Sequence, residues 1–144
     1  MPSMAIPPSR NRKKTDGRPL FDRAVDMHNQ VSDLIRSGKV RSAHDVSDDG
    51  LAVAIAEMCI ASNLGATIEI TAESYRHSIF APIATTYVLE MSEADATASR
   101  LPIIGRVEKQ SRFRLTVDPE IQIDLPVDEL ADAWRTPLAQ GGGR

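Results

Sequence analysis

The polar run His44-Asp-Val-Ser-Asp-Asp-Gly50 contains the side chains of this sequence that could do chemistry together. It lies between a short stretch typical of a strand and a longer apolar stretch typical of a helix. Hydroxyl and carboxylate side chains are common where a helix begins, and the free N–H groups of the first turn also attract phosphates. The run therefore has two interpretations, helix capping and the binding of a phosphate or a magnesium-bound nucleotide. The candidate nucleotide- or phosphate-binding residues are His44, Asp45, Ser47, Asp48 and Gly50.

The other reactive side chains do not form a catalytic or metal-binding set. Ser47 has no base placed as a Ser-His-Asp triad requires, and the histidines are not spaced with carboxylates as metal ligands would be. His28 falls on the apolar side of its predicted helix, where a structural role is expected. Cys59, the one cysteine, fits the core pattern of its helix, and Glu57 is expected to pair with a basic residue. No catalytic residue and no metal ligand is predicted.

Hydrophobic periodicity predicts the elements that position this polar run. Helices are predicted over residues 21–37, 48–63, 93–101 and 127–134, and strands over residues 40–43, 66–70, 86–91, 103–107, 113–117 and 121–125. Gly38 is placed to end the first helix in a left-handed turn, Gly65 follows the second as a stop signal, and Ser92 is a natural N-cap for the third. The second helix is apolar most of the way round, so it should pack on more than one side. Trp134 is expected to anchor the last helix, or to dock a partner if it is exposed.

These elements predict an α/β (α+β) fold, a mixed sheet of about four to six strands covered by helices. Aromatic residues make up only 4% of the chain, so the core must be aliphatic. Four prolines and a basic run make residues 1–19 resemble a disordered basic lead-in. The expected organisation is this lead-in, one domain over residues 20–138, and a flexible tail over residues 139–144.

Charge and composition exclude several classes of partner. The first 18 residues have five cationic side chains and one anionic one, Asp16, so their charge is +4. Since the net charge of the chain is −3, the remaining residues carry −7. The basic lead-in has no aromatic residue and no zinc or helix-turn-helix pattern beside it, so no nucleic-acid partner is expected. No apolar stretch has the length of a signal peptide or a membrane span, and a single cysteine forms no intramolecular disulfide. A cytoplasmic protein without a membrane partner is predicted.

Residues 44–58, HDVSDDGLAVAIAEM, resemble a motif of the phosphoribosylformylglycinamidine synthase family. The family motif, His-Asp-Val-Ser-Asp-Gly-Gly-Leu-Ala, lies in the second half of the enzyme. The segments Ile35-Arg-Ser-Gly-Lys-Val40, Asn63-Leu-Gly-Ala-Thr-Ile-Glu-Ile70 and Val127-Asp-Glu-Leu-Ala-Asp-Ala-Trp134 agree with it. The similarity runs from about residue 19 to 138. Thiamine-monophosphate kinase, of the same aminoimidazole ribonucleotide synthetase superfamily, has a similar turn, but His44 and the long helix favour the purine enzyme.

The resemblance implies the C-terminal domain, or a split fragment, of a purine-biosynthesis ligase that is not self-sufficient. Such an enzyme uses ATP and Mg²⁺ to convert formylglycinamide ribonucleotide to the amidine, with ammonia from glutamine. The implied partners are N-terminal synthetase domains or a synthetase subunit, and a glutaminase subunit. A domain without these partners should expose an apolar patch and form a homo-oligomer. The alternative is a non-catalytic assembly or binding module descended from the same domain.

Two departures from the family pattern weaken an expectation of catalysis. Asp49 stands where the family has a glycine, and a carboxylate about 5 Å from an anion would repel it by roughly 3 kcal/mol per unit charge at an effective dielectric near 20. The segment Phe80-Ala-Pro-Ile-Ala-Thr-Thr-Tyr87 lacks the acidic residue and the arginine of the family's Phe-Gly-Glu-Ser turn. Both changes fall on turns that would face a ligand.

Overall fold

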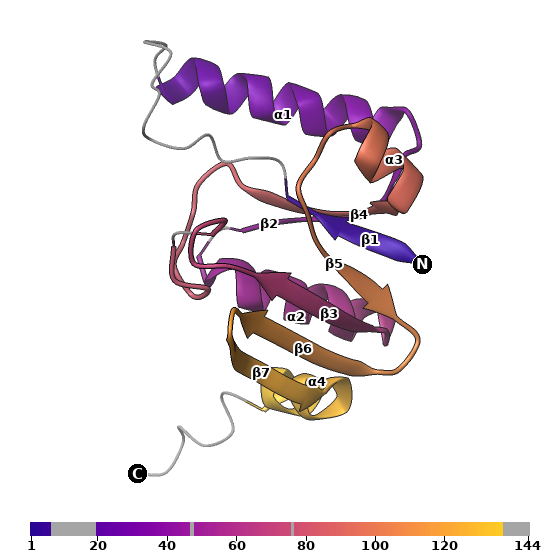
Figure 1. Ribbon diagram of the computed structural model, residues 1–144, viewed down its shortest axis with the longest axis vertical. Coiled ribbons are helices and arrows are strands. Elements are labelled where there is room, and N and C mark those ends of the chain that lie inside the picture. The colour runs from indigo at the N-terminus through magenta and orange to yellow at the C-terminus, as the bar shows by residue number, and fades with distance from the viewer. Residues whose placement is uncertain (7–19, 47, 76, 137–144) are drawn as a thin grey trace.

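One seven-stranded sheet organises the chain, whose computed structural model describes residues 1–6, 20–46, 48–75 and 77–136 (Figure 1). In chain order the elements are β1 (Pro2–Ala5), α1 (Leu20–Arg36), β2 (Val40–Asp45), α2 (Gly50–Ser62), β3 (Gly65–Ile70), β4 (Tyr87–Ser92), α3 (Glu93–Ala98), β5 (Ile103–Glu108), β6 (Arg112–Val117), β7 (Glu120–Pro126) and α4 (Val127–Arg135). The predicted mixed, helix-covered sheet is confirmed, with one strand more than the six expected.

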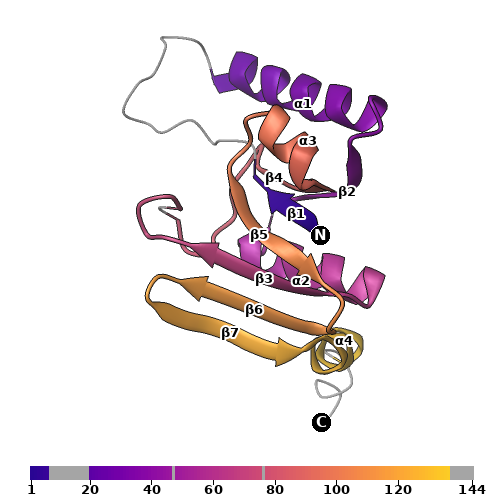
Figure 2. The ribbon, with the colours of Figure 1, turned by 45° about the vertical axis from the view of Figure 1, so that its right-hand side comes forward.

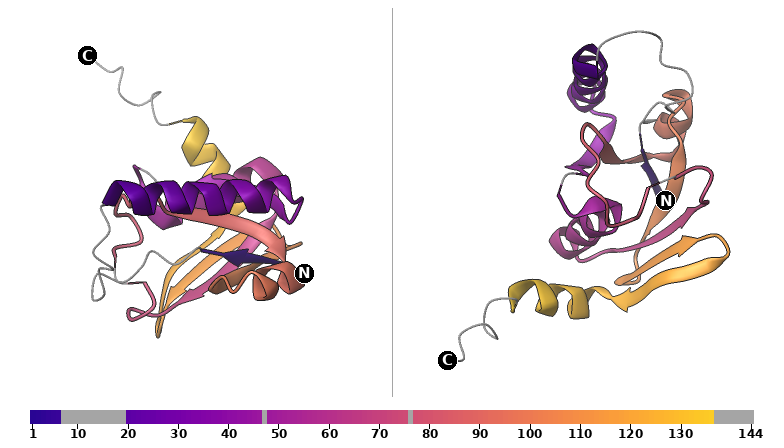
Figure 3. Two further views of the ribbon diagram at one scale, coloured as in Figure 1. Left: turned by 90° about the horizontal axis from the view of Figure 1, so that it is seen from above. Right: turned by 90° about the vertical axis from the view of Figure 1, so that its left-hand side faces the viewer.

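The strand order is β2-β4-β1-β5-β3-β6-β7, so β2 and β7 form the two edges. Neighbouring strands are antiparallel except for β3 and β6, which are parallel. The helices α1 and α4 lie near opposite ends of the molecule (Figure 2). In the right-hand view of Figure 3, α2 and α4 lie on one side of the sheet and α3 on the other.

Residues 2–5 form a strand in the middle of this sheet, which corrects the prediction of an irregular lead-in for this part of the chain. β1 pairs with β4 on one side and with β5 on the other. Met4, Ala5 and Ile6 are buried, with at most 7% of their surface exposed. A four-residue strand beside prolines resembles a loop locally, because its partners lie about 90 to 100 positions away in the sequence. Residues 7–19 lie outside the described part of the chain.

Two aliphatic cores occupy the two faces of the sheet. The larger core joins α2 to the inner side chains of several strands, among them Met4, Val88 and Phe113. The smaller one joins Val31 of α1 and Ala96 of α3 to Leu89 and Met91 of β4. Side chains alternate between faces along a strand, so the short strands β1 and β4 contribute to both cores. The two cores together hold the β2–β4–β1 end of the sheet.

The predicted helix ends agree with the structure in two cases. Gly38 follows α1 at φ +71°, and Lys39 N–H donates to Leu34 O, as in a left-handed helix stop. The Ser92 hydroxyl accepts a hydrogen bond from Asp95 N–H at the start of α3. None of the described helices is long and apolar enough to cross a membrane.

The ends of α2 differ from the prediction. The helix begins at Gly50, and its N-cap is Asp49, whose side chain makes no capping hydrogen bond. The predicted start at Asp48 is therefore two residues early. The left-handed residue that ends α2 is Asn63, at φ 54°, and Gly65 already belongs to β3. Gly65 has a different role, since a Cβ there would lie 2.0 Å from the Gln110 carbonyl oxygen.

The central position of β1 predicts that the first residues of the chain are required for stability. Met4→Ala should lower the free energy of unfolding by about 2 to 5 kcal/mol, because it leaves a cavity in the larger core. Urea denaturation followed by circular dichroism measures this. The matched control is Ile121→Ala, at a side chain that is 58% exposed, where the change should stay within about 0.5 kcal/mol. Equal effects at the two positions would contradict a buried β1.

Candidate functional site

The turn between β2 and α2 brings a histidine and a glutamate together from two elements. His44 Nε2 lies 2.6 Å from Glu57 Oε2, with both side chains less than one third exposed. His44 Nδ1 lies 2.7 Å from the Asp45 carbonyl oxygen and 3.7 Å from the carboxylate of the same residue. Both ring nitrogens thus face oxygen acceptors, which fixes the orientation of the ring. The predicted pairing of Glu57 with a basic residue is confirmed, and that residue is His44.

A small acidic cavity lies at this turn. Its volume is about 120 Å³, and its lining residues are His44, Asp45, Asp48, Asp49, Gly50, Val53, Ala54 and Glu57. Of the candidate binding residues, the structure gathers four here, while Ser47 lies outside the described residues. Pockets that enclose a drug-sized ligand usually measure about 300 to 1,000 Å³. The cavity at the turn therefore does not enclose a nucleotide by itself.

The start of α2 is covered by the segment that precedes β4. Ala52 N–H donates to Ile79 O at 2.9 Å, so one N–H group of the first helical turn already has a backbone partner. Gly50 has φ +82°, and a Cβ at this position would lie 2.6 Å from Ile79 O and from the Phe80 backbone. Gly50 is thus required for the close approach of two backbones, a structural role that needs no phosphate. The anion-binding capacity of this helix start is reduced accordingly.

Asp49 adds a negative charge at the same point. It occupies the N-cap with φ −108° and ψ 5°, and its exposed carboxylate makes no capping bond. The cavity therefore contains four carboxylate residues, of which only Glu57 contacts the histidine through Nε2. Such a charge balance opposes a phosphate and suits a cation.

The segment before β4, residues 80–86, differs from the family pattern and lies beside the turn between β2 and α2. Phe80 is 58% exposed next to Gly50, and Ile83 N–H donates to Val46 O at 3.3 Å. Thr86, which stands where the family has an arginine, is 3% exposed, and its hydroxyl has no hydrogen-bond partner among the described residues. A buried threonine cannot reach a ligand as an exposed arginine would.

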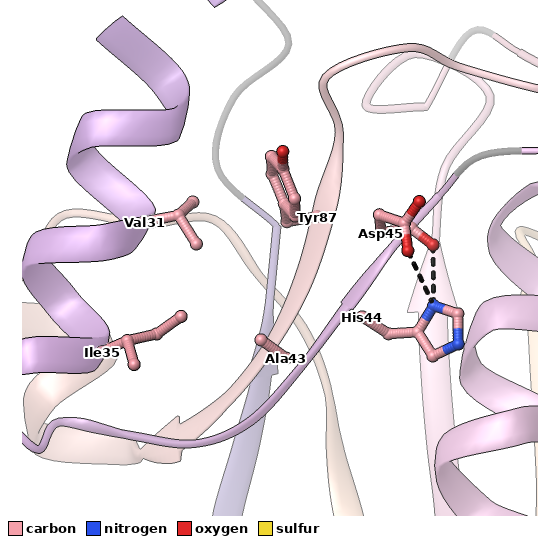
Figure 4. Close-up of a pocket in the computed structure, with 6 residues that line it drawn as sticks. All are labelled: Val31, Ile35, Ala43, His44, Asp45 and Tyr87. Atoms are coloured by element: carbon pink, nitrogen blue, oxygen red, sulfur yellow. Dashed lines mark hydrogen bonds and ion pairs between the residues drawn. The ribbon is translucent and has the colours of Figure 1, made fainter. Parts of the chain in front are cut away.

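A larger cavity, of about 380 Å³, lies between α1 and the β2 edge of the sheet. Figure 4 shows its lining residues, which are Val31, Ile35, Ala43, His44, Asp45 and Tyr87. The Tyr87 hydroxyl hydrogen bonds with His28 Nδ1, and burial together with the Asp45 carboxylate raises the pKa of Tyr87. His28 is exposed, so its predicted position on the apolar side of the helix is wrong, but its ring has a hydrogen-bond partner in Tyr87. Periodicity could not reveal this cavity, because α1 and β4 are far apart in the sequence.

The two remaining candidates, Cys59 and Trp134, differ in burial. Cys59 is 2% exposed, and burial raises the pKa of its thiol to about 12, so the predicted core role is confirmed. Trp134 is 56% exposed, which corrects the expectation that it anchors α4 by packing. The apolar stripe of α4 is formed earlier in the helix by Val127 and Ala131, which are buried.

Neither ATP nor Mg²⁺ finds a complete site at the turn between β2 and α2. Within the residues that the structure describes, no group of three or more His, Cys, Asp or Glu side chains converges as ligands of a metal ion. The cavity at the turn is too small for a nucleotide, and its carboxylates repel phosphates. A nucleotide or metal bound at this turn would need groups from outside it.

A family match and a related protein agree on what this chain is similar to. The family described as "AIR synthase related protein, C-terminal domain" matches residues 19–97. The phosphoribosylformylglycinamidine synthase subunit PurL of Prochlorococcus marinus (strain MIT 9313) is 33% identical over 126 residues, which cover 76% of this chain and 16% of that protein. The chain thus spans about one sixth of the length of this relative.

Solved structures share the fold at lower identity. Thermotoga maritima PurL complexed with ATP has 17% identity and a TM-score of 0.66, over 90% of this chain and 25% of that chain. The same protein complexed with FGAR has 16% identity and a TM-score of 0.67, over 91% and 28%. E. coli HypE, a hydrogenase maturation protein, has 10% identity and a TM-score of 0.53, over 87% and 48%. At these identities the structures show a common fold alone.

The two left-handed glycines predict different costs of substitution. Gly38 has open space around it, so Gly38→Ala should cost only about 1 kcal/mol for its positive φ. Gly50→Ala adds a collision with Ile79 and Phe80 and should cost roughly 3 kcal/mol or more. Chemical denaturation of both variants measures the difference. Similar costs at the two positions would contradict the tight packing on the start of α2.

Burial of the Cys59 thiol predicts that it reacts slowly with thiol reagents in the folded chain. In folded protein at pH 8, the aromatic disulfide DTNB should release almost no thionitrobenzoate, because burial holds the thiol protonated and out of reach. Adding denaturant should release one equivalent per chain, since Cys59 is the single cysteine. Rapid labelling of the folded chain would contradict the core position of this side chain.

Proposed function

Because this chain belongs to the family of AIR synthase related proteins, C-terminal domain, we propose that it works as the C-terminal domain of a phosphoribosylformylglycinamidine synthase. The observation that carries the proposal is the 33% identity with the PurL subunit of Prochlorococcus marinus. The reaction would be the ATP- and Mg²⁺-dependent conversion of formylglycinamide ribonucleotide to the amidine, with ammonia from glutamine. The proposed location is the cytoplasm.

The geometry of the turn supports a domain that is not self-sufficient. Its cavity of about 120 Å³ is one wall of a site, and the start of α2 is partly occupied by the Ile79 carbonyl. The wall presents His44, Asp45 and Asp48 to whatever packs against it. In the proposed arrangement, N-terminal synthetase domains hold most of the nucleotide and metal, and a glutaminase subunit supplies ammonia. The solved structure of PurLQS from Thermotoga maritima supports the view that such proteins work in assemblies.

An assembly module without a catalytic role is the second candidate. It is favoured by the Asp49 carboxylate, which makes no capping hydrogen bond and stands at the helix start where a phosphate would bind. It is also favoured by the loss of the acidic residue and arginine from the segment before β4. Under this alternative, the domain would still bind synthetase domains but would not contribute to the reaction.

Reconstitution separates the two candidates. A PurL subunit lacking the domain that matches this chain would be mixed with the purified chain, formylglycinamide ribonucleotide, ATP, Mg²⁺ and ammonium. The catalytic proposal predicts substrate-dependent release of phosphate only in the mixture. Asp48→Ala should reduce that rate at least about 10-fold, because the carboxylate faces the joint site. A stable complex without activity would support the assembly module, and the absence of any complex would contradict both.

The matched control for Asp48→Ala is Ile121→Glu. Ile121 is 58% exposed on β7, at the far edge of the sheet from the turn. This variant should therefore restore the same rate as the unaltered chain. A comparable loss at both positions would show that Asp48 acts only through stability.

The charge of Asp49 gives a separate prediction. Asp49→Asn keeps the size of the side chain and removes a carboxylate from the start of α2, so it should strengthen the binding of ATP to the reconstituted complex. A repulsion of roughly 3 kcal/mol sets the upper limit, and about a 10-fold lower dissociation constant is expected after screening. Titration calorimetry measures it. Asp128→Asn, at an exposed carboxylate on α4, is the control that should change nothing. Weaker binding of ATP by Asp49→Asn would mean that this carboxylate holds a cation instead.

A further inference from the structure

The strand β2 forms one edge of the sheet, with β4 as its sole described neighbour. Val46 N–H donates to Thr86 O at 2.8 Å where this antiparallel pairing ends. Backbone groups along such a ladder point alternately toward the neighbour and away from it. From Val46 backward, the alternation directs the N–H groups of Ala43 and Asp45 away from β4. The free edge of β2 therefore has donors available for another strand.

This edge is accessible in the described structure. Figure 4 shows β2 in front of β4, with α1 on one side and α2 on the other. Proteins usually protect edge strands with proline, lysine or a covering segment, and β2, with the sequence VRSAHD, has neither of those residues. Its register is irregular only between Val40 and Ser42. The stretch from Ser42 to Asp45 remains regular.

An apolar groove accompanies the free edge. The cavity of about 380 Å³ runs along β2, and Val31, Ile35 and Tyr87 form its wall beside α1. Ile35 is 48% exposed there. Added strands gain affinity from main-chain hydrogen bonds and specificity from side-chain pockets beside them. The edge and the groove together have the features of a strand-addition site.

We propose that the occupant of this edge is β2 of a second copy of the chain, paired antiparallel about a two-fold axis at Ala43. This register pairs Ala43 with the partner's Ala43, and it brings Arg41, which lies at the irregularity of β2, beside the partner's Asp45. By symmetry Asp45 pairs with the partner's Arg41. Both Arg41 and Asp45 are exposed, so their side chains are available for these contacts.

Charge complementarity selects this register. Two-fold axes that keep the free N–H groups facing each other can pass through any residue of the strand, because hydrogen-bonded and non-hydrogen-bonded pairs alternate. A centre at Ser42 or His44 would place Ala43 opposite Arg41 or Asp45 and leave that charge without a directly opposite counter-charge. Centring the pair on Arg41 or on Asp45 would place like charges directly opposite each other. Centring it on Ala43 opposes arginine to aspartate twice and places the smallest side chain of the strand on the axis. Opposite charges directly across two strands stabilise the pair, and like charges destabilise it.

The dimer does not depend on the proposed ligase role, because it rests on the backbone edge of β2, although Asp45 also lines the cavity at the turn. Sedimentation velocity of the full chain between about 1 and 200 μM tests it. The mass should rise from the 15.7 kDa of one chain toward twice that value. A single species of one chain's mass at the highest concentration would overturn the proposal.

The proline variant tests the position of the interface. Ala43→Pro removes an N–H group that points away from β4, so melting of the chain should change little while dimerisation weakens at least about 10-fold. The control is Ile121→Glu at the other edge of the sheet, which should dimerise as the unaltered chain does. Loss of the dimer with Ile121→Glu and not with Ala43→Pro would place the contact at β7 and overturn the proposal.

A charge exchange tests the register. Arg41→Asp should weaken the dimer about 10-fold, because each chain then opposes an aspartate to the partner's Asp45. The double variant Arg41→Asp with Asp45→Arg restores two opposite-charge pairs and should recover the original dimerisation constant. Failure of the double variant to recover would contradict this register, since a purely structural defect would persist in both variants.

Discussion

Four residues at the start of the chain hold the sheet together. β1 is the one strand that connects the β2–β4 pair to the β5-β3-β6-β7 group, because it bonds to β4 on one side and β5 on the other. Its side chains enter both cores, Met4 on one face and Ala5 on the other. The relative position of β2 and α2, and with it the contact between His44 and Glu57, depends on this central strand.

Backbone packing and electrostatics at the turn favour a partial site. The start of α2 is usable by an anion only where its N–H groups are free, yet Ala52 donates to Ile79, and Gly50 allows that segment to approach. The carboxylates of Asp48 and Asp49 then give the surface a negative charge. The features that make this turn a compact structural unit also leave it without the cations and the enclosure that a bound triphosphate would need.

Sequence predicted the features that rest on local patterns. The left-handed Gly38, the cap at Ser92 and the all-round apolar α2 follow from spacing within one turn or one helix, and the structure agrees with them. The pairing of Glu57 was predicted by residue type, but its partner required the fold to bring β2 against α2. The strand β1 and the cavity beside Tyr87 were missed, because both depend on contacts between distant segments. The sequence shows that Asp49 departs from the glycine of the family motif. Only the structure shows that its side chain makes no capping hydrogen bond at the start of α2.

The domain is folded, but its turn between β2 and α2 does not by itself enclose a nucleotide. The most direct measurement is a calorimetric titration of the isolated 144-residue chain with ATP and Mg²⁺, on protein shown by circular dichroism to be folded. The account predicts no saturable heat up to about 1 mM ATP, because the small acidic cavity at the turn neither encloses nor attracts a triphosphate. A dissociation constant in the micromolar range would contradict it and show that this chain alone holds a complete site.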